Sequence, residues 1–338
     1  MIERLIDANG NRAAEGLRAL EDVARFIFND AGSSALAKDL RHRVRQAVPP
    51  GVVAWRDTAG DVGTAITAPG EMERARLTDL IRANAARVQE ALRAAEEGAK
   101  LMGQATGAAL LEAVRYDGYR LESALLSRLP AWHLLRVRLY ALVDTSLTDQ
   151  PERVAEAVAR GGAGAIQLRA KALSPRAYLD LAQRVQAAAR RGGALFIVND
   201  HVAIARALGA DGVHVGQDDL PVATVRAVVG PTCAIGLSAH TADQARQAQV
   251  EAADYLGLGP MFATTTKPLE PQRGPELLDA VRPFLDRPSY AIGGLTPERI
   301  AALRPRLPHG VAVAGHLCRA ADPERAAAEL VDLVGGAD

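Results

Sequence analysis

The stretch LFIVNDHVAIARALGADGVHVG, residues 195–216, contains two short apolar runs, LFIVND and GVHVG, separated by a segment of helical length. Each run is rich in apolar and β-branched residues and is too short for a helix, which indicates a buried strand. The same alternation continues on both sides of this stretch. The runs along the chain are RLYALVDT (138–145), AGAIQLRA (163–170), GALFIVND (193–200), DGVHVG (211–216), CAIGLSAH (233–240), YLGLGP (255–260), SYAIGGL (289–295) and GVAVAGHL (310–317).

These eight runs, with helical segments between them, occupy about 200 residues. Eight strand–helix units of this kind predict a (β/α)8 TIM barrel over residues 138–338. A doubly wound parallel sheet is the alternative fold. The count of eight favours the barrel, as does the lack of a G-x-G-x-x-G motif after the first run.

Residues 1–129 have a different composition, rich in Ala, Leu, Arg and Glu at helical spacing, and predict a mostly α-helical domain. The expected helices cover residues 5–28, 33–48, 77–101 and 107–129. Asp7 is the expected N-cap of the first helix and Ser33 or Ser34 that of the second. Residues 49–70, rich in Pro, Gly, Asp and Thr, form the one long loop of this half, and 129–138 is the predicted junction.

The helical half contains an internal repeat. ANGNRAAEGLRALED (8–22) and ANAARVQEALRAAEE (83–97) share the pattern A-N-x-x-R-x-x-E-x-L-R-x-x-E, at an offset of 84 − 9 = 75 residues. On a helical wheel the Asn and Arg of each copy lie on or beside the apolar face. We therefore expect a buried polar role for Asn9, Arg12, Asn84 and Arg87. The solvated face is expected to carry Glu15, Arg18, Glu21, Glu90, Arg93 and Glu96.

The composition excludes several classes of partner. Lys plus Arg equal Asp plus Glu at 40 each, so no excess of positive charge favours a nucleic acid. The sequence has no apolar run of about 18 residues and no signal-peptide pattern. Its two cysteines give no disulfide framework. We expect a soluble, cytoplasmic protein that binds small molecules, with no nucleic acid or membrane partner, and the sequence leaves a homo-oligomer open.

Polar residues gather where the predicted strands end, which is where TIM barrels bind ligands. Arg169, Lys171 and Lys267 supply enough positive charge for a polyanion such as pyrophosphate. Asp200 and Asp219 are hard oxygen ligands that suit Mg²⁺ beside phosphate oxygens. The glycine-rich ends of the last two strands offer backbone N–H groups to a second phosphate. Other polar residues at these ends are Gln167, Asn199 and Ser238.

Several motifs of the predicted barrel resemble the thiamine-phosphate synthase family, in order and over residues 138–335. They include GAIQLRAK, IGLSAHT, YLGLGPMFATTTK and YAIGGL. Enzymes of that family join hydroxymethylpyrimidine diphosphate to a thiazole phosphate and release pyrophosphate. The resemblance implies that Gln167, Arg169, Lys171, Asn199, Ser238 and Lys267 bind the pyrimidine diphosphate, that Asp200 and Asp219 bind Mg²⁺, and that Thr264, Thr266, Gly294 and Gly315 bind the thiazole phosphate.

The chain departs from the family pattern at two positions. Ala170 stands where the family often has Glu, and its side chain is expected to face away from the site. Gly315 stands where the family often has Ser, which keeps a backbone N–H but removes a hydroxyl. A tautomerase-type barrel of the same family is the alternative, and the cluster of Arg169, Lys171 and Lys267 argues against it.

The helical half resembles a module fused to some bacterial thiamine-phosphate synthases and associated with hydroxymethylpyrimidine-phosphate kinase activity. The motifs are RLIDANGNRAAEGLRALEDVARF, RDTAGDVGT and ANAARVQEALRAAEEGAKL. This resemblance implies ATP as a co-substrate. In the loop 55–64, Arg56 is a candidate phosphate ligand and Asp57 or Asp61 a candidate Mg²⁺ ligand. The alternative is a non-catalytic dimerisation or regulatory module on a monofunctional synthase.

Overall fold

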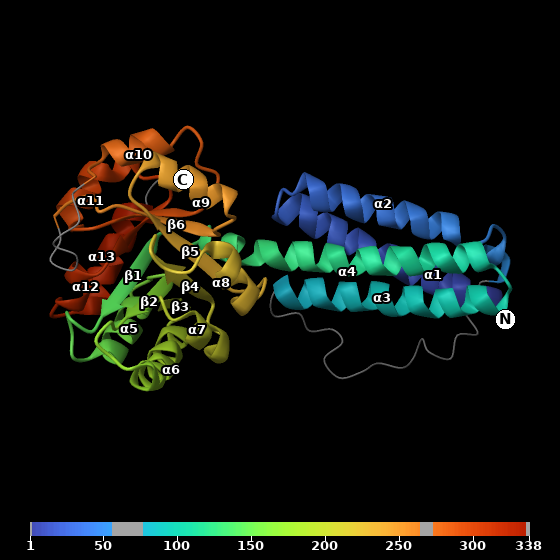
Figure 1. Cartoon of the computed structure of the whole chain (residues 1–338), viewed down its shortest axis with the longest axis horizontal. Coiled ribbons are helices and arrows are strands. Elements are labelled where there is room, and N and C mark those ends of the chain that lie inside the picture. The colour runs from blue at the N-terminus through green and yellow to red at the C-terminus, as the bar shows by residue number, and fades with distance from the viewer. Residues whose placement is uncertain (1, 56–76, 264–272, 336–338) are drawn as a thin grey trace. The chain divides into compact units, whose positions relative to one another are not determined.

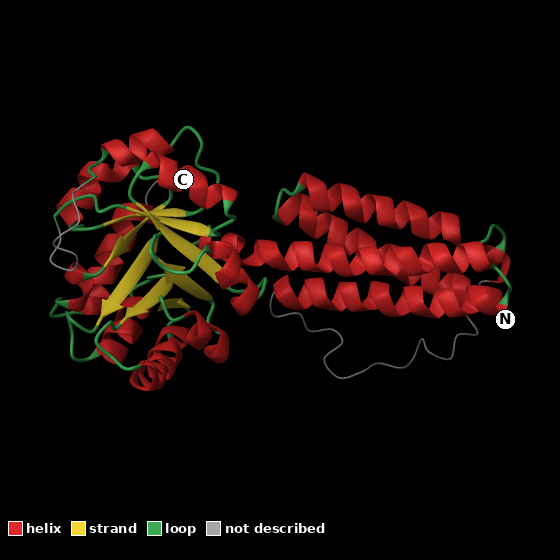
Figure 2. Ribbon diagram, viewed as in Figure 1, coloured by secondary structure: helices red, strands yellow, loops and turns green. Residues whose placement is uncertain are grey.

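The computed structural model describes residues 2–55, 77–263 and 273–335. The chain divides into two compact units, Met1–Leu129 and Pro130–Asp338. In the described part of the first unit the regular structure is entirely helical, whereas the second contains a parallel sheet surrounded by helices (Figures 1 and 2). No helix among the described residues combines the length and the apolar character needed to cross a membrane.

The first unit contains the four predicted helices, the last of which continues past the unit boundary at Leu129. They are α1 (Ile2–Asp22), α2 (Ala31–Ala47), α3 (Leu77–Leu101) and α4 (Ala105–Leu134), with the short elements η1 (Val23–Ile27) and η2 (Val52–Trp55). Leu17 and Leu92, which occupy equivalent positions in the repeat, are both fully buried in the core of this unit. The helical period of the sequence therefore predicted these elements and their core correctly.

Both predicted helix caps are wrong. Helix α1 begins at Ile2, so Asp7 lies inside it and is buried. Helix α2 is capped by Asp30, whose side chain accepts hydrogen bonds from the backbone N–H groups of Gly32 at 3.0 Å and Ser33 at 3.2 Å. Each helix starts earlier than the first strongly periodic residues indicate, and Asp30 lies where its carboxylate meets the open N–H groups.

Helices α1 and α3, which carry the two copies of the repeat, pack against each other in opposite directions. A Cβ added at Gly16 would lie 2.7 Å from Val88 Cγ2 and 3.1 Å from the backbone oxygen of Asn84, so the helix backbones approach closely here. Further along, Gly98 of α3 lies against Leu5 and Ile6 of α1. These contacts require a small residue, which explains the glycine at position 16 of the first copy.

The predicted exposure of the last glutamate in each repeat is wrong. Glu96 is fully buried, and its carboxylate receives Lys100 at 2.6 Å, Arg93 at 2.8 Å and Arg115 of α4 at 3.3 Å. Its equivalent Glu21 is 5% exposed and pairs with Arg41 of α2 at 2.9 Å. The helical wheel placed these carboxylates outside because it considers one helix alone, whereas the next helix covers that flank and supplies the arginine.

We expect replacement of Glu96 by glutamine to destabilise the helical unit in a pH-dependent way. Burial alone would raise the pKa of Glu96, but Lys100, Arg93 and Arg115 together hold it below the ordinary value of 4.5. A lowered folded-state pKa means that the charged form stabilises the fold above pH 4.5 and that this contribution is lost as the pH falls through the folded value. At pH 7 the substitution should cost about 1–3 kcal/mol.

Hydrogen exchange of peptides from α3 in the full chain, followed by mass spectrometry, measures this effect without assuming that both units unfold together. Glu97→Gln, at the exposed neighbouring position, is the control. A Glu96→Gln variant with wild-type protection at pH 7 would contradict the structural role of the buried carboxylate.

The second unit is a closed barrel of parallel strands in chain order, so the predicted TIM barrel is confirmed and the doubly wound sheet is excluded. The strands are β1 (Leu139–Asp144), β2 (Ala165–Arg169), β3 (Leu195–Asn199), β4 (Gly212–Val215), β5 (Ala234–Ala239), β6 (Tyr255–Leu258), β7 (Ser289–Ile292) and β8 (Gly310–Val313). The helices around them are α5 (Pro151–Arg160), α6 (Pro175–Arg191), α7 (Val202–Leu208), α8 (Val222–Val229), α9 (Ala242–Val250), α10 (Glu276–Val281), α11 (Pro297–Leu303), α12 (Gly315–Cys318) and α13 (Pro323–Gly335), with a short turn η3 (Arg304–Arg306).

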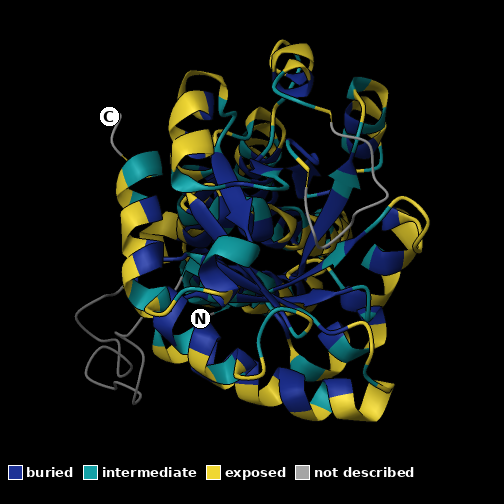
Figure 3. Cartoon of the chain, turned by 90° about the vertical axis from the view of Figure 1, so that its left-hand side faces the viewer, coloured by how far each residue is buried: buried dark blue, intermediate teal, exposed yellow. Residues whose placement is uncertain are grey.

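The barrel has two separate apolar layers, one between sheet and helices and one inside the barrel. Figure 3 shows the strands buried and the outer faces of the helices exposed. Inside, the rings of Tyr140, Tyr255 and Tyr290 pack together, and the hydroxyls of Tyr140 and Tyr255 lie 2.9 Å apart. Burial raises the pKa of all three phenols. A Cβ at Gly236 would lie 2.1 Å from Tyr255 Cζ, so glycine makes room for this ring.

Candidate active site

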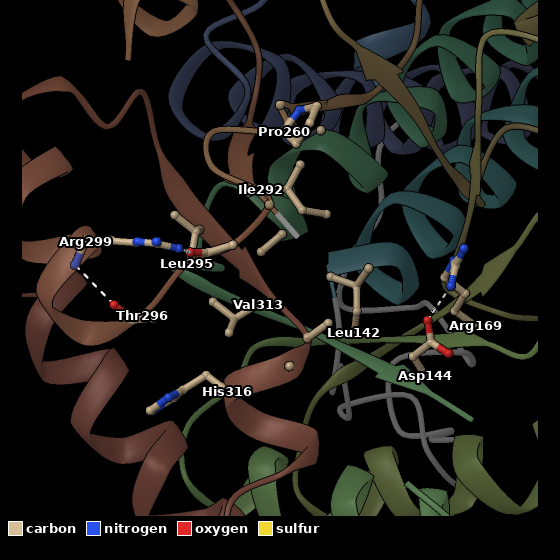
Figure 4. A pocket seen from close by; sticks show the side chains of 18 of the residues that line it. Leu142, Asp144, Arg169, Pro260, Ile292, Leu295, Thr296, Arg299, Val313 and His316 are labelled. Atoms are coloured by element: carbon tan, nitrogen blue, oxygen red, sulfur yellow. Dashed lines mark hydrogen bonds and ion pairs between the residues drawn. The ribbon is translucent and has the colours of Figure 1, made fainter. Parts of the chain in front are cut away.

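A cavity of about 560 Å³ lies at the carboxyl ends of the strands, and we call it the mouth cavity (Figure 4). Its lining comes from the ends of β1, β2, β5, β6, β7 and β8 and from the turns that follow them. Since every strand is parallel, the closed barrel brings these ends to one side of the unit. Residues far apart in the sequence therefore share one cavity.

Arg169, at the end of β2, lines the mouth cavity and is held by Asp144 at the end of β1 (Figure 4). Asp144 is 2% exposed, and its carboxylate also accepts hydrogen bonds from the backbone N–H of Ser146 at 2.9 Å and from the Ser146 hydroxyl at 2.7 Å. Asp144 is not among the site residues predicted from the sequence. It ends the first apolar run in the same way as the residues that were chosen, so the same rule would have found it.

Gln167 and Asn199 connect the ends of β2 and β3. Gln167 Nε2 donates to Asn199 Oδ1 at 3.0 Å, and both side chains are buried. The backbone N–H of Asn199 donates to the hydroxyl of Tyr178, which in turn donates to the backbone oxygen of Leu168. Neither amide is among the residues that line the mouth cavity. Their described contacts fix the position of the β2 and β3 ends beside Arg169.

The two predicted metal ligands lie on consecutive strand ends. Asp200 follows β3 and pairs with Lys171 at 3.4 Å. Its φ of 63° is the left-handed region, which turns the chain sharply after the strand. Asp219, after β4, is exposed and accepts the backbone N–H of Gly216 at 2.7 Å. No group of three or more His, Cys, Asp or Glu side chains suited to a metal occurs within the described residues.

Ser238 of β5 lines the mouth cavity and is joined to the barrel interior by hydrogen bonds. Its hydroxyl lies 3.0 Å from Nε2 of His214, whose Nδ1 lies 3.2 Å from the hydroxyl of Tyr255. The hydroxyl of Tyr255 also lies within hydrogen-bonding distance of the hydroxyl of Tyr140. The serine is therefore oriented by a chain of contacts that begins deep in the barrel.

The opposite wall of the mouth cavity is built from the ends of β7 and β8. Gly294 has a φ of 62°, and a Cβ there would lie 2.4 Å from the backbone oxygen of Ala263, so this position requires glycine. Gly315 and His316 begin α12 on the same wall. Nε2 of His316 is buried and has no hydrogen-bond partner within the described residues. Arg299 of α11 donates to the backbone oxygen of Gly294 and lies over the ring of Phe262.

Ala170, one of the two departures from the family pattern, is 1% exposed and belongs to the apolar layer between sheet and helices. Its side chain faces away from the mouth cavity, as the strand alternation indicates. A shorter side chain at this position therefore leaves the lining of the cavity unchanged.

In the helical unit, three of the four repeat residues that were predicted to be buried line one cavity, together with Glu90. Asn9, Arg12 and Arg87 surround a space of about 450 Å³ between α1 and α3, which we call the α1–α3 cavity. Asn84 does not line it but accepts a hydrogen bond from Arg87 at 3.2 Å. The Asn9 and Asn84 side chains each donate to a backbone oxygen four residues earlier, at 2.9 Å in both copies. The repeated asparagines thus make the same local contact. The predicted buried role is right for Asn9, whereas Asn84 is half-buried. It is wrong for Arg12 and Arg87, which are exposed because their long side chains extend from the edge of the apolar face into solvent.

Six predicted site residues lie outside the described residues. They are Arg56, Asp57 and Asp61 in the helical half and Thr264, Thr266 and Lys267 in the barrel half.

Comparison with known proteins assigns both halves of the chain. Residues 139–317 match the sequence profile of thiamine monophosphate synthase, and residues 4–124 match that of the ThiD2 family. The chain is 41% identical to a thiamine-phosphate synthase of Gloeobacter violaceus over 98% of this chain and 96% of that protein. The chain belongs to the thiamine-phosphate synthase family. It is also 40% identical to a thiamine-phosphate synthase of Thermosynechococcus vestitus, over 98% of this chain and 94% of that protein.

A solved structure supports the same assignment for the synthase barrel. The thiamine phosphate pyrophosphorylase of Pyrococcus furiosus superposes with a TM-score of 0.55 at 30% identity, covering 60% of this chain and 97% of that one. The names of these relatives favour a synthase over the tautomerase-type alternative. The two synthases from Gloeobacter and Thermosynechococcus are similar over nearly the whole chain, so their similarity includes the helical unit as well.

We expect Asp144→Asn to lower the turnover of the synthase by about 10- to 100-fold, because the buried carboxylate that orients Arg169 loses its charge. The measurement is the initial rate of thiamine phosphate formation at saturating substrates. Asp149→Asn, an exposed carboxylate in the same β1–α5 turn, is the matched control. Equal kcat and KM values for Asp144→Asn and the wild type would show that Arg169 needs no anchor.

Proposed function

We propose that the barrel joins hydroxymethylpyrimidine diphosphate to thiazole phosphate, forming thiamine phosphate and releasing pyrophosphate. The observation that carries this proposal is the mouth cavity itself. Arg169, anchored by a buried carboxylate, lies on one wall, and a glycine-built turn and Gly315 lie on the other. An arginine on one wall, and glycine-rich turns with Arg299 and Arg319 on the other, suit two separate phosphorylated substrates.

The pyrimidine diphosphate is assigned to the β2, β3 and β5 side of the site. Arg169 and Lys171 supply positive charge for the diphosphate, and Ser238 has a hydroxyl on the cavity wall. Gln167 and Asn199 belong to this group as well. Lys267 completes it on the basis of the family resemblance.

Asp200 and Asp219 are proposed to hold Mg²⁺. Two carboxylates from neighbouring strand ends fit this ion, because Mg²⁺ takes few protein ligands and completes its shell with waters and substrate phosphate oxygens. When bound, Mg²⁺ supplies charge neutralisation for the departing pyrophosphate. Lys171, which pairs with Asp200 at 3.4 Å, links the metal-binding side to the cationic group.

The thiazole phosphate is assigned to the β7 and β8 side. The N–H groups of the turns at Gly294 and Gly315 are proposed to bind its phosphate, with Thr264 and Thr266 assigned by the family resemblance. His316 is added because Nε2 is buried on this wall and has no protein partner in the described part of the chain. An imidazole there replaces part of the hydrogen bonding that a serine hydroxyl at position 315 would give.

The synthase reaction depends on stabilising separated positive and negative charges, and it needs no proton transfer. The bond between the pyrimidine methylene carbon and the diphosphate oxygen breaks, and its electron pair leaves with pyrophosphate. The electron-rich aminopyrimidine supports the positive charge at the methylene carbon. The thiazole nitrogen then uses its lone pair to form the new C–N bond, and since that nitrogen carries no proton, no general base is needed. Arg169 and Lys171 stabilise the departing charge, and the cavity orients the two reactants.

We expect Asp219→Asn to raise the Mg²⁺ concentration needed for half-maximal synthase activity by about tenfold, because one of few protein ligands is lost. Asp218→Asn is the control, since this neighbouring carboxylate is also exposed but is not proposed as a ligand. Activity is titrated with Mg²⁺ at saturating substrates. Equal shifts in the two variants would indicate a general charge effect and remove Asp219 from the metal site.

For the helical unit we propose a hydroxymethylpyrimidine-phosphate kinase activity. The match to the ThiD2 family supports it, as does the fact that the product of such a kinase is the diphosphate that the barrel uses. A phosphate oxygen of the acceptor attacks the γ-phosphorus of ATP, a new P–O bond forms, and the bond to ADP breaks. The product is the substrate of the barrel. The candidate residues from the sequence are Asn9, Arg12, Asn84 and Arg87, with Arg56, Asp57 and Asp61 in the 55–64 loop.

We place both reactions in the cytoplasm, in keeping with two buried free cysteines.

The test supplies the purified full-length chain with Mg²⁺, ATP, hydroxymethylpyrimidine phosphate and thiazole phosphate, and follows thiamine phosphate by mass. We expect product that depends on ATP. Product formed only from the pyrimidine diphosphate would keep the synthase and leave the helical unit as a dimerisation or regulatory module. No product from either pyrimidine substrate would contradict the synthase proposal.

A further inference from the structure

The helical unit contains another cavity, of about 460 Å³, between α1 and α2, which we call the α1–α2 cavity. Its polar lining consists of Asp7, Asn11, Glu15, Arg18, Arg41 and Arg45, and its apolar lining includes Val44, Val48 and Val53. From the sequence, Glu15 and Arg18 are expected on a solvated face and Asp7 as a helix N-cap, and the other lining residues are not among the predicted site residues. The lining residues come from two helices and the short η2 element, so the cavity cannot be predicted from any one segment of the sequence.

The lining changes in character along the cavity. At one end Asp7 and Asn11 lie near Val48, which closely approaches Gly10. At the other end Arg18 and Arg41 meet the buried Glu21. Along α1, Asp7 and Arg18 are 18 − 7 = 11 residues apart, which corresponds to about 16 Å of helix. The cavity thus has an acidic and apolar end and a basic end.

The arginines at the basic end are held in position from behind. Arg41 pairs with Glu21 at 2.9 Å, and Arg18 Nε bonds to Asp22 at 3.3 Å. Arg45 is exposed and makes no ion pair within the described residues, although Glu15 lines the same cavity. Two guanidinium groups in fixed places and a third without a carboxylate partner are suited to binding a phosphate.

Comparison of the two copies of the repeat shows which residues of the first copy are shared with the second and which are not. The buried ion pair recurs, since Arg41–Glu21 in the first copy corresponds to Arg115–Glu96 in the second, at offsets of 115 − 41 = 74 and 96 − 21 = 75. Of the polar cavity residues, Glu15, Arg18 and Arg41 recur as Glu90, Arg93 and Arg115, whereas Asp7, Asn11 and Arg45 do not. At the same offsets Asp7, Asn11 and Arg45 correspond to Arg82, Ala86 and Tyr119. Both copies therefore contain the ion pair between the helices, while Asp7, Asn11 and Arg45 give the cavity of the first copy a lining that the second copy lacks.

We propose that the α1–α2 cavity binds the phosphorylated aminopyrimidine that accepts the phosphoryl group, an inference that rests on the kinase activity proposed above. The edge of the ring farthest from the phosphate, which carries the ring nitrogens, meets Asn11 beside Asp7, and the ring lies against Val44, Val48 and Val53. The phosphate binds Arg18, Arg41 and Arg45. ATP shares this chemistry, but its triphosphate would bring more negative charge beside Asp7 and Glu15, so the monophosphate is the better match.

The experiment uses the full-length chain and compares Arg45→Ala and Asn11→Ala with the control Arg82→Ala, which removes an exposed arginine at the repeat position equivalent to Asp7. Arg12→Ala, at a candidate residue that lines the α1–α3 cavity, tests that cavity as the competing acceptor site. Kinase kinetics give KM values for hydroxymethylpyrimidine phosphate and for ATP, and calorimetry measures the binding of each compound alone. Synthase activity with the pyrimidine diphosphate reports on the integrity of each variant.

We expect Arg45→Ala to raise the KM and the dissociation constant for hydroxymethylpyrimidine phosphate by about tenfold or more, with the ATP constants and the synthase activity unchanged. Arg82→Ala should match the wild type in every constant. An increase confined to ATP would make this cavity the donor site, and an effect of Arg12→Ala alone would move the acceptor to the α1–α3 cavity. Either result overturns the proposal.

The kinase proposal and the site proposal fail in different ways. If the wild type binds hydroxymethylpyrimidine phosphate without phosphorylating it, the kinase activity is wrong, and loss of binding in Arg45→Ala still supports the site. If the wild type phosphorylates the pyrimidine and Arg45→Ala and Asn11→Ala leave all constants unchanged, the kinase activity stands and the site is wrong. Absence of binding in the wild type overturns the site.

Discussion

The parallel closure of eight strands is the constraint on which the synthase unit depends. In a closed parallel barrel every strand ends on the same side, so a residue needs only to stand at the end of its strand to reach the common site. This geometry brings Asp144, Arg169, Ser238 and Gly294 to one cavity although they are spread over about 150 residues. The inner tyrosine layer then orients the site from below, through His214 and Ser238.

In the helical unit the comparable constraint is a buried carboxylate in each copy of the repeat. Glu21 and Glu96 would be costly to bury alone, and each is matched by an arginine from the following helix. The ion pair fixes how the second helix of each pair lies against the first. Once that scaffold is set, positions such as Asp7 and Arg45 are free to differ between the copies, and a one-sided cavity results.

The sequence was informative where a residue's environment follows from its own segment. Strand alternation and parallel order placed Arg169, Ser238 and Gly294 at the site, and helical spacing located α1 to α4. The sequence was uninformative where the environment of a residue depends on a second segment that packs against it. Glu96 was placed in solvent because its own helix does not show that α4 covers it. The α1–α2 cavity needs residues 7 and 45 together, and the N-cap of α2 depends on where the chain turns after η1.

The packed interior of the barrel determines the side on which ligands enter and leave the site. Tyr140, Tyr255 and Tyr290 fill the space beneath the mouth cavity, and the hydroxyl of Tyr290 bonds to the backbone oxygen of Leu134 behind them. The mouth cavity therefore has a floor, and no ligand passes through the barrel. Both substrates enter and both products leave on one side.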